Sequence, residues 1–167
     1  MLPSFPSGHA GLLGNQGKVV SKFEEAAGKR FDEGLYCAES VLSTIAEHLD
    51  IESDLIPRIA TGFCSGMSRT AGTCGAVTGA VLGLNLAFGR SGVSESVEDS
   101  YEAVQDFIEQ FHQTNGSINC AQLLGCDLGN EEGQQAFREA NLGKKCRKFT
   151  GEAAGIAIRI IEAKRQP

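Results

Sequence analysis

Residues 70–89 read TAGTCGAVTGAVLGLNLAFG and contain no charged side chain. Such a run predicts a buried helix around which the rest of a small domain packs. Thr73 is a suitable N-cap, so we expect Cys74 at the first helical position. Unpaired N–H groups and the positive end of the helix dipole lie there and favour a thiolate. The sequence therefore predicts that Cys74 is a reactive or metal-binding thiol.

Glycine recurs at every fourth position of this segment. Gly75, Gly79 and Gly83 would form a helix face without side chains, which another backbone or a bulky inorganic group can approach closely. The glycines could also serve helix packing alone, since a glycine in a helix interior costs about 1 kcal/mol. A membrane span is a third interpretation, but Thr, Asn and the glycines leave the run only weakly apolar.

Length and composition exclude several classes of protein. The 167 residues, 41% of them apolar, are enough to bury the core of one domain. A net charge of −6 argues against nucleic-acid binding. Residues 1–17 lack the basic and apolar regions of a secretory signal, so we expect a cytoplasmic protein. In that reducing compartment, six cysteines indicate metal binding or redox chemistry rather than a disulfide framework.

The remaining sequence predicts an all-α, single-domain helical bundle around the Gly/Ala-rich central helix. No segment alternates with period two, whereas apolar residues recur at helical spacing in most of the chain. Residues 1–17, rich in Gly, Pro and Ser, are expected to be a flexible N-terminal arm before a helical, cysteine-bearing domain of residues 18–167. Besides the central helix, helices are expected over 18–33, 36–50, 54–60, 94–116, 117–125, 130–142 and 143–165, with a loop over 62–72. In the 94–116 helix, the residues expected to face inward are Val97, Tyr101, Val104, Ile108 and Phe111.

Four cysteines lie at or near the starts of separate predicted helices. They are Cys37, Cys74, Cys120 and Cys146. A group of thiolates is strongly anionic, and helix N-termini supply N–H donors and partial positive charge that stabilise it. The basic run of residues 144–148 also fits a nearby negative group, although a solvated basic patch explains it equally well.

The cysteine spacing matches no local metal motif. The sequence contains no C-x-x-C, no zinc-finger pair, no haem-attachment motif and no ferredoxin-type run. Any shared site must therefore be assembled from distant helices. A metal or cluster site, a dithiol redox pair and inert buried cysteines all remain open from spacing alone.

Several segments together resemble the C-GCAxxG-C-C family of redox-active proteins. The likeness runs from about Gly34 to the C-terminus and is carried by YCAESVL (36–42), GFCSGMSR (62–69), CGAVTG (74–79), CAQLLG (120–125) and Cys146. The resemblance implies a small helical protein, often associated with transporters, with four thiols in a redox or metal role. The cysteine-bearing domain is also similar to the non-haem part of split-Soret cytochromes, which favours an iron–sulfur centre. The implied ligands are Cys37, Cys74, Cys120 and Cys146, and Cys64 and Cys126 are additional.

The leading hypothesis is a cytoplasmic protein that holds a [2Fe–2S] or [4Fe–4S] cluster and passes electrons to a redox partner protein. Backbone N–H groups near Gly75 and the side chains of Arg69 and Lys145 would tune its potential. One alternative is a thiol–disulfide oxidoreductase with Cys74 as a low-pKa attacking thiolate and Cys64 or Cys37 as the resolving thiol. Another is a zinc- or copper-handling module for a transporter. The glycine face could equally pack against a second copy of the chain.

Overall fold

The computed structural model describes the backbone of residues 10–165 and the side chains of residues 21–165. Over this part of the chain it is helical, without a β-strand, which confirms the predicted all-α class. The elements are α1 (Ala10–Asp32), α2 (Cys37–His48), the 3₁₀ helix η1 (Arg58–Phe63), α3 (Cys64–Arg69), α4 (Gly75–Phe88), α5 (Glu98–Asn115), α6 (Cys120–Leu124), α7 (Glu131–Glu139) and α8 (Gly143–Arg165).

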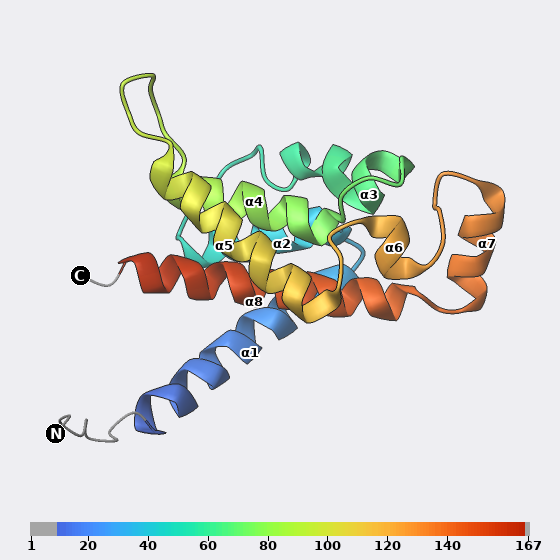
Figure 1. Ribbon diagram of the computed structural model, residues 1–167, viewed down its shortest axis with the longest axis horizontal. Helices are drawn as coiled ribbons and strands as arrows, with labels where there is room; N and C mark the ends of the chain where they lie inside the picture. Colours follow the sequence, from blue (N-terminus) through green and yellow to red (C-terminus); the bar gives the residue numbers. More distant parts are fainter. Residues whose placement is uncertain (1–9, 166–167) are drawn as a thin grey trace, which may run out of the picture.

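Helix α4 lies at the centre of the bundle, as its sequence predicted (Figure 1). It contacts α2, α5 and α8, and α1 lies on the outside along α8 and α2. The short helices α3, α6 and α7 gather at one end of the bundle, beside the first turn of α8. Within residues 10–165, no helix combines the length and the apolar character that crossing a bilayer requires.

The glycine face of α4 is occupied by helix α2. A Cβ atom at Gly79 would lie 2.6 Å from the carbonyl oxygen of Ala38 and 2.7 Å from its Cα atom. A Cβ at Gly83 would overlap the side chain of Ile45. The predicted close approach of another backbone is therefore confirmed, and the other backbone belongs to the same chain.

Several element boundaries differ from the sequence analysis. Helix α1 begins at Ala10, so residues 10–17 are helical, and residues 1–9 lie outside the described residues. The N-cap of α4 is Cys74 itself, because Thr73 is held in a bridge with Asn119 before the helix starts. In place of a helix over 54–60, η1 starts only at Arg58.

The buried face of α5 also differs from the prediction. Phe107 and Ala103 are fully buried and Phe111 is buried as expected, whereas Tyr101 is 58% exposed. Val104 and Ile108 are only partly buried at the edge of the core. The helix is rotated by about one residue from the predicted orientation because two adjacent stripes are apolar, and the aromatic stripe packs inward against Phe149.

Candidate functional site

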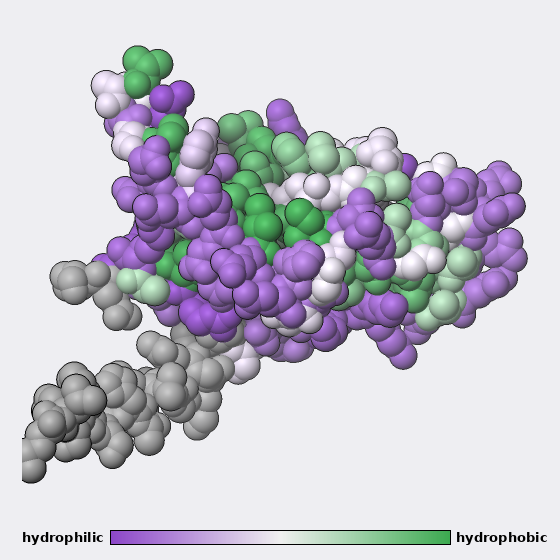
Figure 2. All heavy atoms as spheres, in the orientation of Figure 1, coloured by the Kyte–Doolittle hydropathy of each residue, from purple (hydrophilic) through white to green (hydrophobic). Residues whose placement is uncertain are grey.

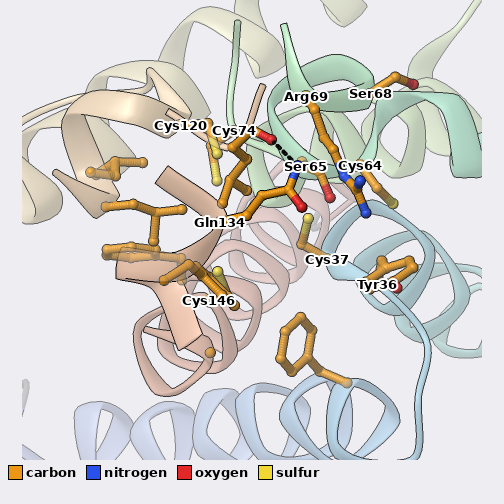
Figure 3. Close-up of a pocket in the computed structure, with 18 of the residues that line it drawn as sticks. Tyr36, Cys37, Cys64, Ser65, Ser68, Arg69, Cys74, Cys120, Gln134 and Cys146 are labelled. Carbon is orange, nitrogen blue, oxygen red and sulfur yellow. Dashed lines mark hydrogen bonds between the residues drawn. The ribbon is translucent and has the colours of Figure 1, made fainter. Parts of the chain in front are cut away.

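Five of the six cysteines line one cavity of about 640 Å³ at the end of the bundle where the short helices gather (Figure 3). All four thiols predicted as a group are among them, and Cys64 is the fifth. They come from five different elements. The five cysteines are Cys37 of α2, Cys64 of α3, Cys74 at the N-cap of α4, Cys120 of α6 and Cys146 of α8. Cys126 is not among the lining residues.

Cys37 is the first residue of α2, and a buried carboxylate fixes the start of that helix. Glu39 accepts a hydrogen bond from the Tyr36 N–H at 2.8 Å, which satisfies one of the unpaired donors of the first turn. Its other oxygen accepts a hydrogen bond from the Thr61 hydroxyl at 2.6 Å. Glu39 therefore ties η1 to α2, and it sets the segment that carries Cys64 beside Cys37.

Helix α3 is a left-handed turn. Ser65, Gly66, Met67 and Ser68 have φ between 51° and 64°, and the φ of Arg69 is 68°. Residues with a Cβ atom rarely adopt this conformation, and runs of them are rarer still. The 62–72 segment was expected to be an irregular loop, and nothing in its composition predicts a left-handed run that includes four side-chain-bearing residues.

Gly66 allows α3 to approach α6 closely. A Cβ at this position would lie 2.6 Å from the Cβ atom of Cys120. The Cys120 N–H also donates a hydrogen bond to the Gly72 carbonyl at 2.9 Å, and the Cys74 N–H donates one to the Ile118 carbonyl at 2.8 Å. These contacts hold Cys74 and Cys120 side by side across the bridge between Thr73 and Asn119.

Asn119 caps α6, which therefore starts later than the predicted helix over 117–125. Its side-chain oxygen accepts a hydrogen bond from the Gln122 N–H at 3.0 Å, and its amide group donates one to the Ala71 carbonyl at 2.6 Å. Asn119 thus fixes both the start of α6, where Cys120 lies, and the segment just before Cys74.

Burial controls the protonation of the thiols. It raises the pKa of Cys74 to about 11, although the backbone N–H groups of Ala76 and Val77 act in the opposite direction. Burial is also the main cause that raises the pKa of Cys120 to about 11 and that of Cys146 to about 12. The N-terminal donors predicted for Cys74 are present, but the expected low pKa is wrong because desolvation of the thiolate outweighs them.

Cys64 lies against Cys37. The neighbouring Cys37 thiol is the main cause that raises the pKa of Cys64, and burial adds to it. The Cys64 sulfur also lies 3.6 Å from the Ala60 carbonyl oxygen, to which its S–H can donate. Gly75 leaves the space for the pair, because a Cβ at Gly75 would overlap the Cys37 sulfur and would lie 3.0 Å from the Cys64 Cα atom.

The charged residues that line the cavity are two arginines, Arg69 and Arg138. Figure 3 shows the side chain of Arg69 directed toward the thiols, next to Ser65. Lys145, predicted to act with Arg69, is exposed and is not among the lining residues.

Two other residues of the basic run form ion pairs away from the cavity. Arg147 pairs with Glu25 at 2.8 Å and Asp32 at 2.7 Å on α1, and Lys148 pairs with Glu152 at 2.8 Å. These ion pairs with α1 and within α8 explain why Arg147 and Lys148 lie beside Cys146 in the sequence.

The thiols surround the cavity instead of meeting at one point. Within the described part of the chain, no three His, Cys, Asp or Glu side chains come close enough together to hold a single metal ion. A mononuclear centre needs its ligands within about 2.0–2.3 Å of one position. The arrangement therefore suits a group or substrate that spans the cavity.

Sequence analysis missed the outer wall of the cavity. Leu128, Gln134 and Phe137 line it from α7 and the segment before that helix. Gln134 donates a hydrogen bond to the Leu128 carbonyl at 3.0 Å, which leaves its side-chain oxygen facing the cavity (Figure 3). The spacing of Gln134 and Phe137 on one helical face was the available signal.

Comparison with known proteins agrees with this arrangement. Residues 35–160 match the model of a family described as "Putative redox-active protein (C_GCAxxG_C_C)". The chain belongs to this family. The C_GCAxxG_C_C match includes every residue that lines the cavity except Phe31, and it confirms the resemblance drawn from the cysteine-bearing segments. No curated protein and no solved structure matches the chain.

Proposed function

We propose that this C_GCAxxG_C_C protein is an electron-transfer protein whose cavity holds an iron–sulfur cluster, [2Fe–2S] or [4Fe–4S], on Cys37, Cys74, Cys120 and Cys146. One observation carries the proposal: these four thiols come from four separate elements and line a single cavity. Four cysteine thiolates are the usual ligand set of both cluster types. When bound, such a cluster would supply a one-electron couple.

The spread of the thiols favours a cluster over a single zinc or copper ion. A mononuclear site needs its ligands around one point, whereas a cluster distributes its cysteines over several irons. No three metal-binding side chains in the described part of the chain lie that close to one another. The same feature argues against the zinc- or copper-handling module. Metal analysis of the purified protein distinguishes that module from an iron–sulfur protein.

The protein's own residues support an anionic, metal-bound set of thiolates. Burial makes a free thiolate at Cys74 or Cys146 costly, and a bound cation removes that cost. The N–H groups of Ala76 and Val77 favour the thiolate form of Cys74, and such donors are among the factors that set a cluster's potential. A redox partner protein would approach the cavity from the side where Arg69 and Arg138 lie.

Anaerobic purification tests the proposal directly. We expect iron and sulfide in stoichiometric amounts and a visible absorption spectrum that bleaches on reduction. Replacing any of Cys37, Cys74, Cys120 or Cys146 by serine should reduce the iron content severalfold, whereas Cys126→Ser, outside the cavity, should retain it. A colourless wild-type protein that binds no iron even after reconstitution would refute the proposal.

A further inference from the structure

Two of the cavity's cysteines, Cys37 and Cys64, lie next to each other beside Gly75. The Cys37 thiol is also the main cause that raises the pKa of Cys64. The Cys64 Cα atom lies 3.0 Å from the position that a Gly75 Cβ would take, and the Cys37 sulfur overlaps the same position. Two cysteines can form a disulfide only when their side chains point at each other across a short distance. Because both residues lie against Gly75, we expect that rotation of the two side chains is enough to bring the sulfurs together.

The surroundings hold the pair together from both sides. Glu39 binds the Tyr36 N–H at the start of α2 and the Thr61 hydroxyl of η1, so the segments that carry the two cysteines are joined by one buried carboxylate. Thr78 of α4 donates a hydrogen bond to the Phe63 carbonyl at 3.1 Å, directly before Cys64. Both cysteines are buried, since Cys37 is 8% and Cys64 is 3% exposed.

We propose that Cys37 and Cys64 form a second redox couple of this protein, a reversible dithiol–disulfide pair that reduces a small organic disulfide admitted to the cavity. This activity does not depend on the cluster of the proposed function, but the two share Cys37, so the couple operates when Cys37 carries no iron. It also differs from the pairing expected from the sequence, in which Cys74 was the attacking thiol.

The chemistry is a double thiol–disulfide exchange. The thiolate of Cys37, the more exposed of the two, attacks one sulfur of the organic disulfide, forms a mixed disulfide and releases one thiol. Cys64 then attacks the Cys37 sulfur, forms the intramolecular disulfide and releases the second thiol. The two protein thiols lose two protons and two electrons, and the organic disulfide takes them up as two thiols.

Peptide mapping of the full-length protein tests the couple. The protein is reduced, freed of iron with a chelator and treated with hydroxyethyl disulfide, and the remaining thiols are alkylated before digestion with trypsin. Arg58 lies between the two cysteines, so trypsin places Cys37 in residues 31–58 and Cys64 in residues 59–69. We expect these two peptides to be the predominant disulfide-linked pair, and dithiothreitol should separate them again.

Variants distinguish a couple from two independently modified thiols. In Cys64→Ser, with Cys64→Ala as a second form, Cys37 should retain the hydroxyethyl adduct because no second thiol displaces it. Cys126→Ser should behave as the wild type. The proposal is wrong if 31–58 and 59–69 are recovered unlinked from the wild type, or if Cys37 is linked mainly to a peptide that contains another cysteine.

The same variants separate this proposal from the cluster. Cys64→Ser should bind iron as the wild type does, since Cys64 is not among the four proposed ligands, yet it should lose the linked peptides. A wild-type protein that binds iron but never forms the linked pair would overturn the couple alone. A protein that forms the linked pair but binds no iron would overturn the cluster alone.

Discussion

Replacing Gly79 by alanine tests the packing that places Cys37 and Cys74 on neighbouring helices. The added methyl group would lie 2.6 Å from the Ala38 carbonyl oxygen and 2.7 Å from its Cα atom. Because these are backbone atoms, no side-chain rotation relieves the overlap, and α2 must move away from α4. Overpacking of this kind costs about 3 kcal/mol, at the upper end of its usual range. The better helix propensity of alanine returns about 1 kcal/mol, so the net loss of stability is about 2 kcal/mol.

Thermal and urea unfolding measure this loss. For a protein of this size, a loss of that magnitude lowers the melting temperature by about 4–8 °C. The matched control is Gly143→Ala, at the first position of α8, where a Cβ would meet nothing within 4 Å. It should leave the stability unchanged or slightly raised. If Gly79→Ala were as stable as Gly143→Ala, the conclusion that α2 packs closely against the glycine face of α4 would be refuted.

Three further outcomes follow from burial, thiol ionisation and capping. Phe107→Ala should cost about 3–5 kcal/mol in urea unfolding because its ring is fully buried, whereas Tyr101→Ala should change stability by less than about 0.5 kcal/mol; equal losses would contradict the orientation of α5. In iron-free protein at pH 8, Cys74 should be alkylated about a hundredfold more slowly than in the unfolded chain, since burial raises its pKa from 9.0 to about 11. The alkylation rate, followed on the tryptic peptide of residues 70–90, should rise about tenfold per pH unit. A rate that stops rising by about pH 9 would contradict the raised pKa. Asn119→Ala should lose about 1–2 kcal/mol and lower the iron content, while Asn130→Ala, which removes only the cap of α7, should lose stability without losing iron.

The helices could be predicted because their apolar residues recur at helical spacing and their ends carry ordinary signals. Gly125 ends α6 in a left-handed conformation as expected, and Cys146 lies in the first turn of the last helix. The gathering of Cys37, Cys74 and Cys120 was also anticipated, since each lies at a helix start where anionic groups are favoured. These features depend on neighbours along the chain, which the sequence displays.

Features that depend on tertiary contacts were not predictable. The pKa of Cys74 depends on how much of the bundle covers it, and local helix position gave the wrong direction. The orientation of α5 depends on whether Tyr101 or Phe107 finds a partner in the core, and both stripes have helical spacing. The left-handed turn that directly follows Cys64 is one that no local residue preference favours.

The left-handed turn of α3 has a consequence for how the sequence tolerates change. Ser65, Met67 and Ser68 hold side chains in a backbone region where glycine would be the more stable choice by about 1–2 kcal/mol per residue. Selection for stability alone would favour glycine at these three positions. The fold therefore keeps strained backbone in α3, next to the cysteines of the cavity. Strained segments commonly occur beside functional sites.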